Sequence, residues 1–269
     1  MLYPKIEVDD AIVMVTGGAR GIGKATADLF AARGATVCAG DLDGASYTVD
    51  VTSRNSFAEF VAAVIDRYGR VDVLVNNAGV MPLGDFVSED GAVSRTTLEV
   101  NVWGLIHGMR VVLPHMIERG RGHIVNVASM AGKLAVPGMA VYNASKFAAV
   151  GLSAAVREEY RDTGVSVTAV LPSAVRTRLA SGVPLGRGLP TVEPESVASA
   201  IVRSVANRRD EIAVPRYLAG WDLLRAITPD AVMGLARRMI GDRRALISVE
   251  QDVRDDYDRA IEAQARERR

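Results

Sequence analysis

The sequence predicts an α/β fold, in which helices cover both faces of a parallel sheet, for three reasons. Apolar runs alternate with helical patterns along residues 11–214, and nearly continuous apolar runs are typical of strands that are buried on both faces. A glycine-rich turn joins the first apolar run to the first helical pattern, as it does in doubly wound sheets. The chain has 269 residues, of which 49% are hydrophobic, so we expect one main domain with a full core.

The elements follow from where each apolar run or helical pattern starts and stops. Strands are expected at 11–16, 36–41, 71–76, 122–128, 165–171 and 211–214, with a short one near 46–49. Helices are expected at 21–33, 53–68, 95–118, 141–162 and 194–206. Pro194 and Glu195 make a good start for the last helix, because a first turn does not need the missing N–H of proline and favours an acid.

The expected architecture is therefore a three-layer, Rossmann-type doubly wound parallel sheet with a C-terminal helical extension. Residues 1–215 would form the main domain, including a substrate loop at about 178–193. Residues 216–269 would form the extension, which we do not expect to be a separate domain.

The turn after the first strand has the pattern of a dinucleotide fingerprint, Thr16-Gly17-Gly18-Ala19-Arg20-Gly21-Ile22-Gly23. Gly17 allows the tight turn, Gly21 lets the backbone approach a pyrophosphate, and Gly23 lets the helix pack close to the strand. The helix N-terminus then offers N–H groups and the positive end of its dipole to phosphates. A plain tight turn is the alternative, but the flanking strand and helix favour a dinucleotide site.

Asp41 ends the second strand, 18 residues after Gly23, near the spacing at which a carboxylate binds the adenosine ribose 2′-hydroxyl. A carboxylate there would repel a 2′-phosphate, so Asp41 favours NAD over NADP. Arg20 favours the opposite choice, because a guanidinium can pair with a 2′-phosphate. A surface aspartate in a turn with Asp43 and Gly44 is the other interpretation. We expect NAD, with NADP less favoured.

Tyr142 and Lys146 lie four residues apart in a helical run, so their side chains share one face. A free tyrosine, with a pKa of about 10, is a poor acid–base catalyst near neutral pH, and a nearby cation lowers that pKa. On their own, the two residues would be read as a buried tyrosine and a solvated lysine. Three stretches favour a site instead: the glycine turn, the strand that ends in Asp41, and Asn76-Asn77-Ala78-Gly79 after a strand, which is followed by Asn101 and by Ser129 at the end of a later strand.

Together these residues resemble the short-chain dehydrogenase/reductase family, in its short single-domain form, over roughly residues 10–215. The resemblance implies an NAD(P)-dependent oxidoreductase that acts on CH–OH groups, with a catalytic tetrad of Asn101, Ser129, Tyr142 and Lys146. Tyr142 would be the general acid or base at the substrate oxygen, and Ser129 would hydrogen-bond the same oxygen. Lys146 would lower the pKa of the tyrosine and bind the nicotinamide ribose, while Asn101 would hold a water that links Lys146 to solvent.

The resemblance also implies the cofactor contacts. Val175 and Thr177, which follow Pro172, would hold the nicotinamide carboxamide, and Asp50 and Val51 would contact the adenine. The residues expected to bind the cofactor are Gly17, Arg20, Gly21, Ile22, Gly23, Asp41, Asp50, Val51, Asn77, Ala78, Gly79, Tyr142, Lys146, Pro172, Val175 and Thr177.

Substrate choice is expected to lie in residues 130–139 and in the loop after residue 178. Apolar residues on a glycine-rich loop favour a mobile lid over a lipophilic substrate, although a loop that docks its leucines into the core has the same pattern. A steroid, a retinoid, a terpenoid alcohol, a fatty-acyl ketone or a 3-oxoacyl thioester would fit. The expected pocket residues are Met130, Leu134, Met139 and Leu179.

Composition limits the partners. Lys+Arg and Asp+Glu number 32 each, so no nucleic-acid partner is expected. Cys38 is the only cysteine, and the three histidines show no metal-ligand pattern, so no metal site is expected. The sequence has neither a signal-peptide pattern nor an apolar run long enough to span a membrane, so we expect a cytoplasmic protein.

The extension and the assembly are less defined by the sequence. Residues 216–244 would cap the pocket or extend a subunit interface, with contact to an anionic membrane surface as a less favoured alternative. Residues 250–269 are nearly all polar and are expected to form a solvated helix or a frayed tail. The resemblance implies a homodimer or homotetramer that packs the Asn101 and Tyr142 helices against a partner. A non-catalytic dinucleotide-binding sensor or scaffold is the alternative function, but its usual mark would be a broken tetrad.

Overall fold

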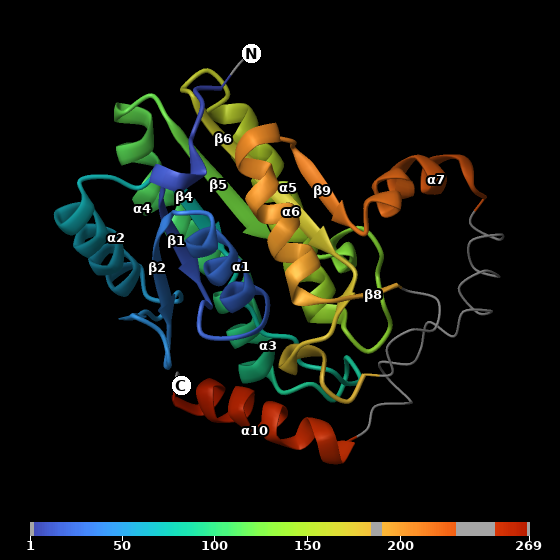
Figure 1. Ribbon diagram of the computed structural model, residues 1–269. Coiled ribbons are helices and arrows are strands. Elements are labelled where there is room, and N and C mark those ends of the chain that lie inside the picture. The colour runs from blue at the N-terminus through green and yellow to red at the C-terminus, as the bar shows by residue number, and fades with distance from the viewer. Residues whose placement is uncertain (1–2, 184–189, 230–250, 268–269) are drawn as a thin grey trace.

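The computed structural model describes residues 3–183, 190–229 and 251–267 (Figure 1). Parts of the expected substrate loop (184–189) and of the expected extension (230–250) lie outside the described residues.

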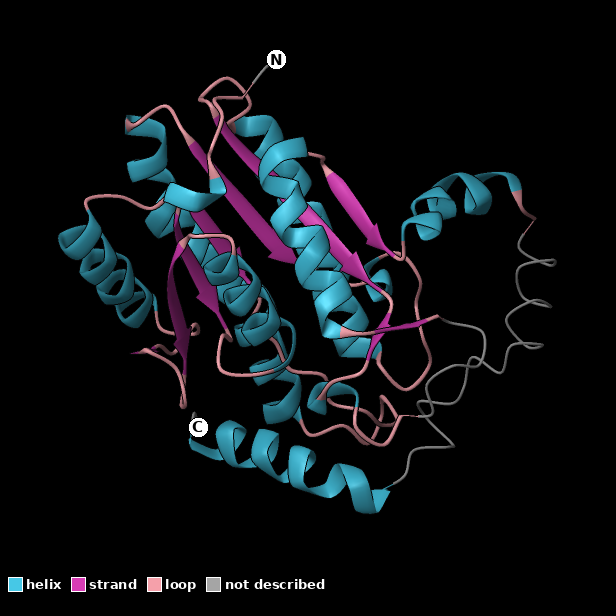
Figure 2. Ribbon diagram, viewed as in Figure 1, coloured by secondary structure: helices cyan, strands magenta, loops and turns pink. Residues whose placement is uncertain are grey.

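One parallel sheet forms the middle layer of the fold (Figures 1 and 2). In the described part of the chain it has 7 strands in the order β3-β2-β1-β4-β5-β6-β9. The strands are β1 (Ile12–Thr16), β2 (Thr36–Asp41), β3 (Tyr47–Thr48), β4 (Val73–Asn76), β5 (Gly122–Val127), β6 (Val165–Pro172) and β9 (Glu211–Val214). The strand order runs outward in both directions from β1 and β4. The carboxyl ends of these two strands therefore flank the crevice in which such sheets bind ligands.

Helices form the outer layers. α1 (Gly21–Ala32) and α6 (Pro194–Asn207) pack against each other and cover one face of the sheet. α2 (Arg54–Tyr68), α4 (Gly104–Glu118) and α5 (Ala140–Glu159) cover the other face. The remaining elements are α3 (Gly91–Leu98), α7 (Trp221–Ile227), α10 (Gln251–Glu267), and the two-residue strands β7 (Ala174–Val175) and β8 (Thr191–Val192). This arrangement confirms the predicted fold class.

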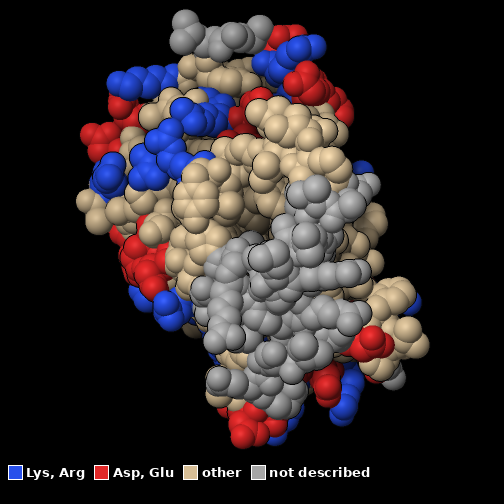
Figure 3. All heavy atoms as spheres, turned by 90° about the vertical axis from the view of Figure 1, so that its right-hand side faces the viewer, with Lys and Arg blue, Asp and Glu red and all other residues tan. Residues whose placement is uncertain are grey.

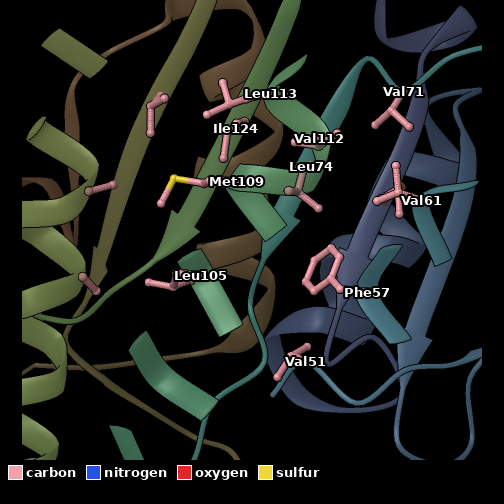
Figure 4. Close-up of a cluster of buried hydrophobic side chains, with 14 of the residues drawn as sticks. Val51, Phe57, Val61, Val71, Leu74, Leu105, Met109, Val112, Leu113 and Ile124 are labelled. Carbon is pink, nitrogen blue, oxygen red and sulfur yellow. The ribbon is translucent and has the colours of Figure 1, made fainter. Parts of the chain in front are cut away.

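The hydrophobic core has two halves, one on each face of the sheet. Successive side chains of a strand point to opposite faces, and β4 follows this rule: Leu74 belongs to the half beneath α2 and α4, whereas Val73 and Val75 belong to the half beneath α1 and α6. Figure 4 shows the first half, in which Leu74 and Ile124 from the sheet lie near Phe57 of α2 and Met109 of α4. Both faces of the central strands are buried, which explains their unbroken apolar sequence.

Two expected elements differ from the structure. The helix expected at 95–118 begins earlier, because the Asp90 side chain accepts a hydrogen bond from the Ala92 N–H and caps α3. A π-helical turn, Glu99–Trp103, separates α3 from α4. Such turns are frequent at functional sites, and this one carries Asn101.

The expectation of a solvated helix or frayed tail at 250–269 is wrong for one face of α10. Arg254, Ile261 and Ala265 are buried there, and the helix packs against α3. Among the described residues, every helix is too short or too polar to cross a bilayer. On the face shown in Figure 3, Lys and Arg side chains lie beside Asp and Glu side chains, in keeping with the balanced composition.

A buried carboxylate ties the sheet together at its amino edge, opposite the crevice. Asp72 is 1% exposed, and its carboxylate accepts hydrogen bonds from the Ile12 N–H at 3.0 Å and from Arg70 Nε at 2.9 Å. Arg119 and Arg121 each donate to it at 3.2 Å. Burial raises the pKa of the Asp72 carboxyl, but these hydrogen bonds and positive charges outweigh burial and the pKa is lowered.

We therefore predict that Asp72→Asn lowers the free energy of unfolding by about 2–4 kcal/mol at neutral pH, because it removes a buried charge from its partners. A depressed folded-state pKa stabilises the protein above the unfolded-state pKa of about 3.9, and this contribution is lost as the pH falls through the folded-state value. The difference between the two proteins should therefore shrink below about pH 4.

Urea denaturation across pH measures both effects. Asp10→Asn is the matched control, because Asp10 also pairs with Arg70, at 2.7 Å, but its side chain is 84% exposed. Equal losses in the two variants would contradict the role assigned to Asp72.

Candidate active site

A cavity of about 1110 Å³ opens at the carboxyl edge of the sheet. Its walls come from the segments that follow β1, β2, β4, β5 and β6, and from α10. Of the expected catalytic, cofactor-binding and substrate-pocket residues, all but Gly23 and Asn101 line this cavity. It has a polar end around the glycine turn and an apolar end beyond Tyr142.

The glycine turn at the polar end requires glycine at each of its three key positions. Gly17 and Gly21 have φ angles of 63° and 54°, a region that other residues avoid. A Cβ at Gly23 would lie 1.9 Å from the Gly17 carbonyl oxygen, so no side chain fits between α1 and the turn. The Asn77 amide donates to the carbonyls of Thr16 and Gly17, at 3.0 and 3.1 Å, and fixes the turn from the next strand.

This turn fits the pyrophosphate of a dinucleotide. α1 begins at Gly21, on the wall of the cavity, with its N-terminus in the position that attracts phosphates. Gly23 lies behind the wall and serves the packing rather than the contact. Asn77 also lines the cavity, but its side chain is engaged with the turn.

The expected adenosine end of the site is anchored by Asp41 at the end of β2. Its carboxylate accepts hydrogen bonds from the N–H groups of Ala19, at 3.1 Å, and Leu42, at 2.8 Å, so it is held against the glycine turn. Arg20 forms an ion pair with Asp43, and both side chains are largely exposed. The positive charge of Arg20 thus already has a carboxylate partner within this chain.

Asp50 and Val51 line the same end of the cavity. The Asp50 carboxylate accepts hydrogen bonds from the N–H and the hydroxyl of Thr52, at 3.0 and 2.7 Å. The carbonyl of Val51 lies 3.1 Å from Nδ1 of His107. Both residues are therefore held by hydrogen bonds that leave them on the cavity wall.

Tyr142 and Lys146 lie where the two ends of the cavity meet. Tyr142 is 7% exposed and forms a side-chain hydrogen bond with Ser129. Lys146 Nζ donates to the Val127 carbonyl at 3.1 Å and lies 5.6 Å from the centre of the Tyr142 ring. Ser129 is fixed in turn, since its Oγ accepts from the Ala131 N–H at 3.1 Å.

Burial dominates the titration of both groups. It raises the pKa of Tyr142 to about 12, although the hydrogen bond with Ser129 acts in the opposite direction. It lowers the pKa of Lys146 to about 8. The sequence suggested a phenol made more acidic by its ammonium neighbour, whereas in this structure the low polarity around both groups disfavours both charged forms.

Asn101 stands behind the site instead of lining it. Its side chain is 1% exposed. Its amide oxygen accepts a hydrogen bond from the Val80 N–H, and its amide nitrogen donates to the Val80 carbonyl, each at 2.9 Å. The amide nitrogen also donates to the Ser145 hydroxyl at 3.0 Å. A Cβ at Gly79 would lie 3.2 Å from Asn101 Oδ1 and 3.7 Å from Lys146 Nζ, so glycine keeps the space between the amide and the ammonium open.

The apolar end of the cavity collects the residues expected to contact the substrate. Met130, Leu134, Met139 and Leu179 all line it. Met81, which the sequence did not single out, and Val183 of the expected substrate loop join Tyr142, Met139 and Leu179 in one hydrophobic cluster. Val175 and Thr177 lie on the wall between this end and the glycine turn, where the Thr177 methyl group comes within 3.3 Å of the Cβ position at Gly21.

The C-terminal helices also supply cavity residues: those of α7 lie in the segment that was expected to cap the pocket, whereas those of α10 were not expected. Trp221 and Leu224 of α7 and Tyr257 and Ile261 of α10 line the cavity. The signal in α10 was a stripe of Tyr257, Ile261 and Ala265 at four-residue spacing, masked by the polar residues around it. Among the described residues, no group of histidine, cysteine and acidic side chains is arranged to hold a metal ion.

Comparisons with known proteins agree with this geometry. The family described as short chain dehydrogenase matches residues 11–186. The 3-oxoacyl-acyl-carrier-protein reductase FabG of Thermotoga maritima is 33% identical over 226 residues, which are 73% of this chain and 91% of that protein. Human estradiol 17-beta-dehydrogenase 11 is 32% identical over 254 residues, covering 87% of this chain and 84% of the relative.

A solved structure has the same fold. The short chain dehydrogenase/reductase of Burkholderia phymatum, crystallised in complex with NAD, has a TM-score of 0.72 and is 27% identical. The match covers 82% of this chain and 93% of that one. The chain therefore belongs to the short-chain dehydrogenase/reductase family of NAD(P)-dependent oxidoreductases.

Proposed function

We propose that this enzyme transfers a hydride between NAD and a lipophilic secondary alcohol or ketone, with Tyr142 as the general acid or base. The observation that carries the proposal is the position of the buried Tyr142–Lys146 pair, between a glycine turn that fits a dinucleotide and an apolar pocket. NAD, when bound, supplies or accepts the hydride. The chain binds the reactants, excludes water and moves the proton.

The proton chemistry follows from the protonation state of Tyr142. With a pKa of about 12, the phenol keeps its hydrogen at neutral pH and is ready to donate it to a ketone oxygen during reduction. Ser129 supports the same oxygen with a second hydrogen bond. In alcohol oxidation, Tyr142 must first lose its proton, and the charged form of Lys146 then stabilises the phenolate.

The preference for NAD rests on two carboxylates. Asp41 is fixed at the end of β2, where a ribose 2′-phosphate would meet its negative charge. Asp43 pairs with Arg20, the one residue of the glycine turn that favours NADP. The solved relative in complex with NAD supports the same choice.

The class of substrate rests on the apolar end of the cavity. Its hydrophobic side chains favour a molecule with a large apolar body. The two relatives point to different substrates within this class, since one is an estradiol dehydrogenase and the other a 3-oxoacyl reductase. A 3-oxoacyl thioester is therefore the second candidate substrate beside a lipophilic alcohol or ketone.

We also propose that the protein works in the cytoplasm as a homodimer or homotetramer whose interface includes the α4 and α5 helices. Three large apolar side chains are exposed on or beside them: Leu98, Trp103 and Phe147, at 41%, 48% and 41%. Residues 216–269 would be an extension of the one catalytic domain, 1–215. The packing of α10 on α3 and the ion pair between Lys133 and Asp222 of α7 support this division.

Tyr142→Phe should lower kcat/KM for ketone reduction by about 100- to 10,000-fold, because the variant retains the ring but has no proton to donate. The affinity for NADH should stay within about twofold, since the dinucleotide contacts remain. Stopped-flow kinetics and NADH fluorescence measure the two quantities. Tyr160→Phe, at the surface end of the same helix, is the control. Full activity of Tyr142→Phe would exclude the proposed mechanism.

Wild-type protein should bind NADH more tightly than NADPH. Asp41→Ser should shift the ratio of the two dissociation constants toward NADPH by about tenfold or more, because it removes the repulsion of a 2′-phosphate and leaves Arg20 in place. Fluorescence titration with both cofactors gives the ratio. Asp28→Asn, an exposed carboxylate of α1 paired with Lys24, should leave it unchanged. A wild-type preference for NADPH would show that Asp41 does not select the cofactor.

Replacing both Trp103 and Phe147 by arginine should convert the proposed oligomer to a species of lower mass, because each new arginine places a charge in the proposed desolvated interface. Light scattering after size-exclusion chromatography measures the mass. Phe86→Arg, at a side chain that is 68% exposed elsewhere, is the control. An unchanged mass in the double variant would mean that these helices are not the interface.

A further inference from the structure

α10 closes the cavity at the end where Tyr142 lies. The helix runs below the carboxyl ends of the strands and packs against α3 (Figure 1). Arg254, Ile261 and Ala265 are 0%, 4% and 3% exposed, and their spacing places them on one helical face. Tyr257 and Ile261 line the cavity from this face. The opposite face carries exposed charges, such as Arg259.

Arg254 fastens this helix to both sides of the cavity. Its guanidinium donates to the carbonyls of Leu179 and Ser181, each at 3.1 Å, and to the carbonyl of Met81. Asp258 accepts from Nε at 3.1 Å. Burial lowers the pKa of Arg254, and the charge of Asp258 acts in the opposite direction. A fully buried guanidinium is tolerated only where its donors are satisfied, so these contacts fix the position of the helix.

Tyr257 is held beside the site by this anchor. The Arg254 guanidinium lies 4.8 Å from the centre of its ring, and its hydroxyl oxygen accepts a hydrogen bond from the Met81 N–H at 2.9 Å. Burial raises the pKa of Tyr257 to about 12, and Tyr142 is close enough to add to the increase. The hydroxyl therefore keeps its hydrogen, and in the described part of the chain it accepts the Met81 bond without donating one of its own.

We propose that Tyr257 contacts the substrate and determines specificity, and that Arg254 is the positioning residue that holds Tyr257 and Ile261 at the cavity. The ligand class is an apolar ketone or secondary alcohol that carries a second hydrogen-bond acceptor. Tyr142 serves the reacting oxygen, Tyr257 donates to the second oxygen, and Ile261 packs against the apolar body. This inference rests on the proposed function and adds a substrate requirement to it.

The anchor is tested first, by hydrogen–deuterium exchange of the full-length protein. Arg254→Met should speed exchange of the α10 amides by about tenfold or more, because the helix loses its link to three carbonyls. Arg254→Lys has one ammonium in place of the planar guanidinium, so its α10 amides should exchange at a rate between those of the wild type and Arg254→Met. Arg259→Met changes the exposed face of the same helix and should have no effect. NADH affinity reports that each variant is folded. Equal exchange in the two methionine variants would overturn the role of Arg254.

Specificity is tested with a series of apolar methyl ketones and the same ketones carrying a second carbonyl at increasing distance. For the best dicarbonyl compound, Tyr257→Phe should lower kcat/KM about tenfold, through KM, as expected for one lost hydrogen bond. The simple ketones should change by less than about twofold. Tyr217→Phe, at a side chain that is 70% exposed, should change neither class. An equal effect on both classes, or no effect, would overturn the proposal.

The affinities of the same ketones for the NADH-loaded wild-type and Tyr257→Phe proteins give a second comparison. Measuring these affinities requires no turnover. Failure of the wild type to reduce any ketone would count against the proposed function alone. A dicarbonyl compound that binds wild type about tenfold more tightly than Tyr257→Phe would still support the role of Tyr257. Equal binding of all ketones by both proteins would overturn it.

Discussion

The approach of α1 to the end of β1 is the constraint on which the site depends. A single Cβ at Gly23 would lie 1.9 Å from the Gly17 carbonyl oxygen, so the helix reaches this position only because residue 23 has no side chain. The same approach puts the helix N-terminus on the cavity wall and brings the Ala19 N–H to the Asp41 carboxylate. Asn77 then joins the turn to β4. The proposed binding of the pyrophosphate and the proposed selection of the ribose thus both depend on one close backbone contact.

Burial is the second determinant, and it makes the site chemically useful. Tyr142 and Lys146 are each almost fully enclosed, so each is shifted toward its neutral form. A neutral phenol is the form that gives a proton to a ketone. In the proposed mechanism, hydrogen bonds from Tyr142 and Ser129 would stabilise the charge that develops on a substrate oxygen more strongly in these surroundings than in water. α10 contributes to this enclosure, because Tyr257 and Ile261 complete the wall beyond Tyr142.

Most of the fold could be predicted from the sequence, because it is encoded locally. The central strands are apolar on both faces, so they appear as unbroken runs, and the glycine turn has a pattern that few other structures require. The inward face of α10 was missed because its contacts are tertiary: Arg254 and Tyr257 bond to Met81, 173 and 176 residues away. The π-helical turn at Asn101 was missed for the same reason, since its side chain bonds to Val80, 21 residues away. The pKa of Tyr142 depends on burial, which the four-residue spacing to Lys146 cannot report.

The most direct test of the account is NADH absorbance after the wild-type protein is mixed with NADH and a series of lipophilic ketones. We predict a loss of NADH that requires a ketone and yields one alcohol for each NADH consumed. NADH binding without consumption of NADH by any ketone or 3-oxoacyl thioester would contradict it. That result would instead indicate a protein that binds the dinucleotide without using its hydride.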